Sequence, residues 1–279
     1  MSKKFAVLGS PISHSKSPAI HAAAYRVLGE EWTYSSVEVP KGGLKRFIET
    51  DGDDFSGFSV TMPLKEDAFQ LAAQRDSISE LTGSANTLVR QADQWSAYNT
   101  DVFGITQAIS RAYSNIPEKS LIIGSGATAT SALVAISILS PASEVGIFAR
   151  NKVARAELAS FGKTLGLRVK TARSVRKAMQ QSDLTISTLP GGAIDDVAAK
   201  LRSKKRFMPG GLLLDVAYHP WPSQLANLWS EHNQRVVSGL DMLIWQAVAQ
   251  IRIFRLGDPT IELPNEIAVV QAMLNAVSD

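Results

Sequence analysis

The chain reads Leu121-Ile-Ile-Gly124-Ser-Gly126-Ala127-Thr-Ala129, continues as an apolar helical run to Leu139, and then reads Val145-Gly-Ile-Phe-Ala-Arg150. A strand, a glycine-rich turn, a helix and a second strand in this order form a βαβ unit. Gly124, Gly126 and Ala129 match the spacing G-x-G-x-x-G/A between a strand and a helix. Such glycines let the backbone approach a pyrophosphate at the helix N-terminus. The stretch therefore predicts a dinucleotide-binding fold.

The end of the second strand indicates which dinucleotide binds. An NAD site places Asp or Glu about 20 residues after the glycines, where the carboxylate accepts from the ribose 2′-OH. Here Arg150 ends the strand, Asn151, Lys152 and Arg155 follow, and no carboxylate stands at the tip. Because a cationic fork suits a 2′-phosphate, we expect NADP. A solvated Arg150 at a helix start is the alternative that this pattern leaves open.

Strands alternate with helices after this unit, which predicts a parallel, doubly wound sheet. We expect strands at 168–170, 184–187, 212–215 and 235–237, helices at 153–165 and 174–180, and the loops 188–192 and 216–222 along one sheet edge. The N-terminal part predicts strands at 4–9, 33–39 and 57–61, a hairpin of 84–90 with 95–98 around the turn 91–94, and helices near 18–28, 44–50 and 102–113. Two more helices are expected at 238–256 and 265–277.

Length and composition narrow the class of protein. A chain of 279 residues is about right for two domains, and 45% hydrophobic with 20% charged residues is typical of a soluble globular protein. With no cysteine, a disulfide framework, thiolate catalysis and a zinc–cysteine site are excluded. The four histidines lack metal-ligand spacing, so no metal is expected. The net charge of +3 comes from scattered basic residues, so we expect no nucleic-acid partner.

The N-terminus and the apolar runs bear on location. The chain begins with Met-Ser-Lys-Lys and runs directly into the strand-like stretch from Phe5 to Gly9, which is unlike a signal peptide. No apolar run approaches the roughly 20 residues that span a bilayer. We therefore expect a cytoplasmic protein with no membrane partner.

Polar side chains gather where ligands bind in open α/β sheets, at the carboxyl ends of strands. The loop Ser10–Ser17 follows the first strand, with Ser17 as the expected N-cap and Pro18 as the first helical residue. Lys65 is expected in the first turn of a helix, where a cation is disfavoured, and this misplacement hints at chemistry. The plain alternatives are a capping loop without ligand and a solvated lysine.

A second polar group precedes the dinucleotide unit. Asn86, Asn99, Thr100 and Asp101 lie close together in the chain or across the predicted hairpin. A simple N-cap role for Asp101 remains open. On the long helix near the C-terminus, Gln246 lies four residues before Gln250, on the same face. Both could equally be ordinary surface amides.

Taken together, these pieces resemble the shikimate dehydrogenase family over essentially the whole chain, most closely its actinobacterial branch. The motifs that carry the resemblance are Gly9-Ser-Pro-Ile-Ser-His-Ser-Lys-Ser-Pro18-Ala-Ile-His21, Ser59-Val-Thr-Met-Pro-Leu-Lys65, Gly83-Ser-Ala-Asn-Thr87, Asn99-Thr-Asp101, the turn Gly124–Ala129 with Ala149-Arg150, Tyr218-His-Pro-Trp-Pro222, and Gly239-Leu-Asp-Met-Leu243 with Gln246-Ala. Their order and spacing together are highly specific, although each alone is not.

The resemblance implies a two-domain α/β fold and an enzyme of chorismate and aromatic amino-acid biosynthesis. It implies NADPH-dependent, reversible reduction of 3-dehydroshikimate to shikimate, an oxidoreductase reaction on a CH–OH group. Residues 1–101 would form the substrate-binding and catalytic domain, residues 102–238 a Rossmann-like NADP-binding domain, and residues 239–279 helices that return to the substrate domain. A small-molecule substrate is expected, and a homodimer is one option for assembly.

The resemblance also implies roles for single residues. Ser15 and Ser17 would hold the substrate carboxylate, with help from Tyr218, and Lys65 with Asp101 would form the catalytic pair. The ring hydroxyls would contact Thr61, Lys65, Asn86, Asp101 and Gln246. The residues expected to bind the cofactor are Gly124, Ser125, Gly126, Ala127, Thr128, Ala129, Arg150, Asn151, Arg155, Thr188, Val216 and Gly239.

Three positions depart from the pattern of the family. Ser59 stands where the family usually has Asn, which puts one polar contact near the substrate in question. Ala127 replaces a glycine of the turn, and Ala149 replaces an Asn before Arg150.

Two other functions are weighed against this one. A quinate/shikimate dehydrogenase that uses NAD would tend to have threonine in place of Ser17 and an Asp at the end of the cofactor strand. A non-catalytic NADP-binding regulator would need neither Lys65 nor Asp101.

Overall fold

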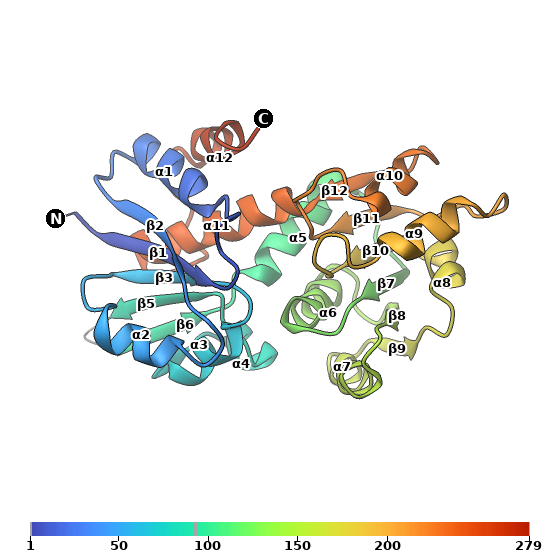
Figure 1. The fold of residues 1–279 in the computed structure, drawn as a ribbon, viewed down its shortest axis with the longest axis horizontal. Helices are drawn as coiled ribbons and strands as arrows, with labels where there is room; N and C mark the ends of the chain where they lie inside the picture. Colours follow the sequence, from blue (N-terminus) through green and yellow to red (C-terminus); the bar gives the residue numbers. More distant parts are fainter. Residues whose placement is uncertain (1, 92–93, 279) are drawn as a thin grey trace. The chain divides into compact units, whose positions relative to one another are not determined.

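Buried strands that alternate with helices build two six-stranded sheets in this α/β protein (Figure 1). The computed structural model describes residues 2–91 and 94–278. It divides into two compact units, one of Met1–Gly104 with Leu243–Asp279 and one of Ile105–Met242. The C-terminal helices therefore return to the first unit, as expected. That the two units act as substrate and cofactor domains, with boundaries at 101 and 238, stays a prediction.

The sheet of the first unit is mixed, with the strand order β2-β1-β3-β5-β6-β4. Its strands are β1 (Lys4–Gly9), β2 (Thr33–Glu38), β3 (Gly57–Val60), β4 (Gln74–Arg75), β5 (Thr87–Gln91) and β6 (Gln94–Tyr98). Strands β2, β1 and β3 are parallel, whereas β5 pairs antiparallel with both β3 and β6. The predicted hairpin is thus confirmed, and Ala92 and Asp93 of its predicted turn lie outside the described residues.

Helices cover both faces of this sheet (Figure 1). On one face lie α2 (Leu44–Thr50) and α3 (Lys65–Leu71), where Ile48 of α2 and Leu64, the N-cap of α3, share a buried cluster with the strand residue Phe58. On the other face lie α1 (Ser17–Leu28) and α11 (Gly239–Leu256), where Phe5 stacks on Phe254 with ring centroids 4.3 Å apart. Helix α12 (Glu266–Asn275) packs beside α1. The short helix α4 (Ser77–Thr82) precedes β5.

The sheet of the second unit is entirely parallel, in the order β12-β11-β10-β7-β8-β9. Its strands are β7 (Lys119–Ile123), β8 (Glu144–Phe148), β9 (Arg168–Thr171), β10 (Leu184–Ser187), β11 (Leu212–Asp215) and β12 (Val236–Ser238). The helices of this unit are α6 (Ala127–Leu139), α7 (Lys152–Thr164), α8 (Val175–Gln181), α9 (Asp195–Arg202) and α10 (Gln224–Ser230), and α5 (Asp101–Ala112) connects the two units along the chain. This is the doubly wound order of dinucleotide-binding folds, whose ligand crevice lies where β7 and β10 adjoin.

One expected helix start was wrong. Lys16, not Ser17, is the N-cap of α1, and it makes no side-chain capping bond. Ser17 is the first helical residue, and its buried side chain hydrogen-bonds Tyr34. A side-chain partner on a distant strand has replaced the local capping bond, which sequence alone does not reveal. Pro18 in the first turn and the left-handed Gly29 at the end of α1 are as expected.

No helix within residues 2–91 and 94–278 is long and apolar enough to cross a membrane.

The buried His21 yields a prediction about stability. Burial lowers the pKa of His21 from 6.5 to about 3, and a side-chain hydrogen bond with Gln250 raises it only in part. Between these values the unfolded chain binds a proton that the folded protein does not, so the free energy of unfolding falls as the pH falls, by about 1.4 kcal/mol per pH unit for this residue. Urea unfolding of wild type and His21→Gln at several pH values measures the slope. We expect His21→Gln to lose this contribution to the slope of unfolding free energy against pH, and His14→Gln, at an exposed position, to keep it. Equal slopes in all three proteins would contradict the lowered pKa of His21.

Candidate functional site

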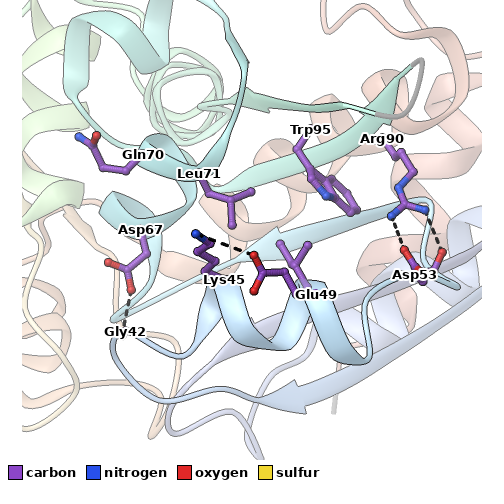
Figure 2. Close-up of a pocket in the computed structure, with 10 residues that line it drawn as sticks. Gly42, Lys45, Glu49, Asp53, Asp67, Gln70, Leu71, Arg90 and Trp95 are labelled. Atoms are coloured by element: carbon purple, nitrogen blue, oxygen red, sulfur yellow. Dashed lines mark hydrogen bonds and ion pairs between the residues drawn. The ribbon is translucent and has the colours of Figure 1, made fainter.

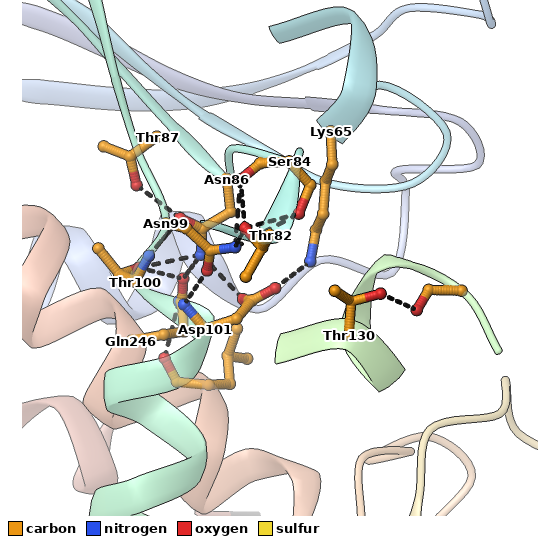
Figure 3. Close-up of polar contacts among 12 residues, drawn as sticks. Lys65, Thr82, Ser84, Asn86, Thr87, Asn99, Thr100, Asp101, Thr130 and Gln246 are labelled. Carbon is orange, nitrogen blue, oxygen red and sulfur yellow. Dashed lines mark hydrogen bonds and ion pairs between the residues drawn. The ribbon is translucent and has the colours of Figure 1, made fainter. Parts of the chain in front are cut away.

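Lys65 and Asp101 form a shielded ion pair in the first unit (Figure 3). Strand β3 ends at Val60, and α3 begins directly at Lys65. Asp101 is the first residue of α5, where the helix dipole favours a carboxylate. The Lys65 Nζ lies 2.5 Å from Asp101 Oδ2, and the two side chains are only 14% and 6% exposed. The sequence-predicted pair is therefore brought together.

The amide of Asn86 holds the other carboxylate oxygen. Its Nδ2 donates to Asp101 Oδ1 at 2.8 Å and also lies 3.2 Å from Gln246 Oε1. Its Oδ1 accepts from the Thr100 backbone N–H at 2.9 Å. Each oxygen of Asp101 thus has its own donor, one cationic and one neutral, which fixes the plane of the carboxylate (Figure 3).

The segment before Asp101 is held independently. The Asp101 backbone N–H donates to Asn99 Oδ1 at 3.0 Å, and Asn99 Nδ2 donates to Thr82 Oγ1 at 2.9 Å. The carboxylate of Asp76 accepts from the backbone N–H groups of Asn99 and Ser79 at 3.2 and 2.8 Å. Burial raises the pKa of Asp76 against these hydrogen bonds. The loop that presents Asp101 is thereby set before any ligand arrives.

The loops after β1 and β3 lie against each other. A Cβ on Gly9 would meet Thr61 Cγ2 at 2.4 Å, and Ser10 N–H donates to Met62 O at 3.0 Å. Thr61 and Ser15 are both partly exposed, and Ser15 Oγ accepts from the Ser17 backbone N–H at 3.3 Å. These hydroxyls and Lys65 follow parallel strands of one sheet, so they share its carboxyl edge.

The predicted cofactor residues all follow strands of the second unit. The turn 124–129 follows β7, and Arg150, Asn151 and Arg155 follow β8. Thr188, Val216 and Gly239 follow β10, β11 and β12. Carboxyl ends of parallel strands share one edge, so the structure gathers these residues at the edge where dinucleotides bind. Tyr218 lies on the same loop as Val216, and burial raises the pKa of its phenol, which stays a neutral donor.

The glycine-rich turn fits a pyrophosphate. Gly124 has φ +125°, and a Cβ there would meet Thr188 Oγ1 at 2.2 Å, so only glycine lets the loops after β7 and β10 approach so closely. Gly126 precedes α6, and an added Cβ would meet nothing within 4 Å. Among the described residues no side chain caps α6, so its first backbone N–H groups can take an anion. Ala127 is the first residue of α6 and is partly exposed.

The residues after β8 divide into a capping residue and two cations. Asn151 Oδ1 caps α7 by accepting from the backbone N–H groups of Val153 and Ala154 at 3.0 and 3.2 Å. Arg155 reaches back to Ala149 O at 3.4 Å, while the Arg150 side chain is exposed. This arrangement leaves Arg150 available to a 2′-phosphate.

The loop with Val216 and Tyr218 is anchored by a buried carboxylate. Asp215 accepts from Ser223 Oγ at 2.6 Å and from the Ala217 backbone N–H at 3.4 Å. Burial raises the pKa of Asp215 against these bonds. Gly239 is required beside this loop, because a Cβ there would meet Val216 O at 2.0 Å.

A separate groove of about 710 Å³ lies on the first unit beside α2 and α3 (Figure 2). Lys45 and Glu49 line it with Trp95 and Arg90, and Arg90 is paired with Asp53 at 2.8 Å. None of the predicted site residues lines this groove. In the described part of the chain, no three His, Asp or Glu side chains are grouped to hold a metal.

Sequence reasoning missed Tyr34 and Thr87 as supports of Asn86, and it singled out Ser59 and Gln250 without connecting them to it. Tyr34, Ser59, Thr87 and Gln250 are connected by hydrogen bonds that end on Asn86. The spacing of Gln246 and Gln250 was the one available signal, and both proved buried rather than at the surface.

Comparison with known proteins supports one family. The family model described as "Shikimate dehydrogenase substrate binding domain" matches residues 7–88. A protein of Syntrophobacter fumaroxidans named shikimate dehydrogenase (NADP(+)) is 30% identical over 275 residues, which cover 98% of this chain and 94% of that protein.

Two solved structures are similar over nearly the whole chain. The crystal structure of Mycobacterium tuberculosis shikimate dehydrogenase has a TM-score of 0.84 and 36% identity, covering 98% of this chain and 99% of the other. The enzyme of Thermus thermophilus, crystallised in complex with NADP(H) and shikimate, has a TM-score of 0.79 and 26% identity, covering 99% of this chain and 100% of the other.

The two glycines of the turn should respond differently to the same substitution. Gly124→Ala combines φ +125° with an added Cβ 2.2 Å from Thr188 Oγ1, so its thermal midpoint should fall. Gly126→Ala meets nothing in the protein, so its thermal midpoint should stay near wild type while dinucleotide affinity falls. Thermal unfolding and fluorescence titration measure the two effects. Unchanged dinucleotide affinity in Gly126→Ala would argue against a pyrophosphate at this helix end.

Proposed function

The chain belongs to the shikimate dehydrogenase family, and we propose that its Lys65 and Asp101 are the catalytic pair. It is an NADP-dependent oxidoreductase that reversibly reduces 3-dehydroshikimate to shikimate in chorismate and aromatic amino-acid biosynthesis. The observation that carries the proposed roles is the shielded contact of Lys65 Nζ with Asp101 Oδ2 at 2.5 Å, with Asn86 on the second carboxylate oxygen.

Lys65 acts on the substrate oxygen. NADPH, when bound, supplies the hydride to the carbonyl carbon. Negative charge then builds on the carbonyl oxygen, where the Lys65 ammonium donates a hydrogen bond and then the proton. Asp101 keeps the ammonium in place by pairing with it, and Asn86 keeps Asp101 in place. In the reverse direction Lys65 takes the proton from the hydroxyl as the hydride leaves.

The other polar residues at the edge of the first unit bind and orient the substrate. Ser15 and Ser17 provide hydroxyls for the carboxylate, because each can donate a hydrogen bond to an anion. Thr61, Asn86 and Gln246 supply hydroxyl and amide groups for the ring hydroxyls. Tyr218 contributes a neutral phenol to the carboxylate, consistent with its raised pKa.

The second unit binds NADP. Gly124, Gly126 and the open N-terminus of α6 support a role in holding the pyrophosphate. Arg150 pairs with the 2′-phosphate, with Arg155 beside it. The remaining contacts come from residues that follow the same strand ends, namely Ser125, Ala127, Thr128, Ala129, Asn151, Thr188, Val216 and Gly239. Residues 1–101 with 239–279 then serve the substrate, and 102–238 serve NADP.

The alternative of a quinate/shikimate dehydrogenase is separable by assay. Rates on shikimate and quinate with NADP and NAD test the quinate/shikimate enzyme, and a clear preference for quinate with NAD would favour it. The exposed Arg150 supports the NADP enzyme.

A homodimer and a cytoplasmic location stay predictions. Light scattering of the purified protein tests the first, and cell fractionation tests the second.

Removing the proposed proton donor should slow turnover strongly with little effect on substrate binding. Lys65→Ala is expected to lower kcat by about 10²–10⁴-fold with little change in KM, because the ammonium acts mainly in the transition state. Steady-state rates of shikimate oxidation with NADP measure this effect. Lys45→Ala, a lysine with an 80% exposed side chain on the same unit, is the control and should match wild type. Near-normal kcat in Lys65→Ala would refute the mechanism.

Removing the proposed 2′-phosphate ligand should change cofactor preference. Arg150→Ala is expected to raise KM for NADP by about 10–100-fold, the value of a charged hydrogen bond, and to leave KM for NAD almost unchanged. Lys163→Ala, which removes an exposed cation from the far end of α7, is the matched control. An equal effect of Arg150→Ala on both cofactors would show that Arg150 does not read the 2′-phosphate.

A further inference from the structure

We propose that Ser59 positions the catalytic pair rather than binding substrate. It is the second member of a buried hydrogen-bond relay that begins at Tyr34 and orients the Asn86 amide against Asp101. This inference rests on the proposed function, because its main readout is the turnover of shikimate. The members of the relay, in order, are Tyr34, Ser59, Gln250, Thr87, Asn86 and Asp101.

The first half of the relay joins two strands to the long helix. The Tyr34 hydroxyl on β2 donates to Ser59 Oγ on β3 at 2.6 Å. The Ser59 hydroxyl donates in turn to Gln250 Oε1 on α11 at 2.8 Å. Ser59 is 4% exposed and Gln250 is 1% exposed, so water does not compete readily for these bonds. Three elements are thus tied together at one serine.

The second half of the relay orients Asn86, and Figure 3 shows its last members, Thr87, Asn86 and Asp101. Gln250 Nε2 donates to Thr87 Oγ1 at 3.0 Å and to the Asn86 backbone carbonyl at 3.0 Å. The Thr87 hydroxyl donates to Asn86 Oδ1 at 2.9 Å, and Asn86 Nδ2 donates to Asp101 Oδ1 at 2.8 Å. Thr87 therefore holds the Asn86 side-chain amide through Oδ1, and Nδ2 faces the carboxylate of Asp101.

The direction of the relay is determined at two independent points. Asp101, as a carboxylate, can only accept, so Asn86 must present Nδ2 to it and Oδ1 to Thr87. The Asn86 backbone carbonyl can also only accept, so Gln250 must present Nε2 to it and Oε1 to Ser59. Both constraints make every donor point from Tyr34 toward Asp101. Aligned hydrogen bonds polarise one another, so each strengthens the next.

Ser59 has no hydrogen left for a ligand. A serine hydroxyl carries a single hydrogen, which Ser59 gives to Gln250, while Tyr34 occupies one of its lone pairs. Burial raises the pKa of Tyr34 above its ordinary value, against hydrogen bonds shared with Ser59 and Ser17 that act to lower it, so the phenol stays protonated and can donate to Ser59. Through that contact with Ser17, the relay begins beside a residue that we assign to the substrate carboxylate.

Two substitutions break the relay on either side of Gln250. Ser59→Ala removes the donor to Oε1, and Thr87→Val removes the hydroxyl that holds Asn86 Oδ1 while keeping the shape of the side chain. Each should lower kcat for shikimate oxidation by about tenfold, the equivalent of one hydrogen bond, with KM changed by less than about twofold. Because either break disconnects the same relay, the double variant should lose little more than a single variant. Thr87→Ser, which restores the hydroxyl, should recover most of the rate.

A matched control, on β6 of the same sheet, separates loss of the relay from general damage caused by removing a buried serine hydroxyl. Ser96 is also buried, at 3% exposure, and its hydroxyl donates to Gln91 Oε1 at 3.0 Å, a serine–glutamine bond like that of Ser59. Ser96→Ala should therefore leave kcat unchanged. The proposal is overturned if Ser59→Ala raises KM at constant kcat, as for a substrate ligand, or if its effect on kcat simply multiplies with that of Thr87→Val.

A second readout does not depend on turnover. The free energy of unfolding of the wild type, Ser59→Ala, Thr87→Val and the double variant should show the same non-additivity. Both substitutions remove bonds from one connected set. If the wild type fails to oxidise shikimate, the proposed function fails, while additive unfolding energies refute the relay and coupled ones support it.

Discussion

The buried pairing of Lys65 with Asp101 is the interaction on which the first unit depends. Removing two charges from water costs several kcal/mol per ion, and their attraction offsets this cost only if the remaining polar atoms are also satisfied. Asp101 meets that condition with one oxygen on Lys65 and the other on Asn86. The partners around the pair are neutral amides and hydroxyls, which supply donors without adding a competing charge. Lys65 therefore keeps its hydrogen-bonding capacity for a developing oxyanion.

The scaffold fixes these groups before a substrate binds. Asn99 and Asp76 hold the backbone of the loop at Asp101, while Ala85 N–H donates to Lys65 O at 2.9 Å and ties the loop after α4 to the start of α3. The side chains of the proposed catalytic pair thus come from separate elements, α3 and α5, and each element is held by hydrogen bonds to the loops beside it. Such preorganisation matters because dipoles already aligned with the developing charge need no reorganisation during the reaction.

Local sequence patterns predicted what local forces determine. The glycine turn after β7, the parallel order of the second sheet and the start of α3 near Lys65 all follow from short-range signals, and the structure has them. The predicted N-cap of α1 was wrong, because the Ser17 side chain hydrogen-bonds Tyr34 on β2 instead of capping the helix. Strand β4 has two residues and α4 has six, too few for a periodic pattern. The bond from Ser59 to Gln250 joins residues 191 positions apart, which no spacing rule can detect.

The two units differ in how many of the polar groups at their proposed sites are already hydrogen-bonded. In the first unit, Asn86 and Asp101 are hydrogen-bonded internally, so each has one orientation. The second leaves donors open, with an uncapped α6, open space at Gly126 and an exposed Arg150. Chemistry on a small ring requires groups that cannot turn, whereas binding a pyrophosphate requires N–H groups and cations that have not been used. Substitutions that disturb Asn86 or Asp101 should therefore act mainly on kcat through orientation, and those at Gly126 or Arg150 mainly on cofactor affinity.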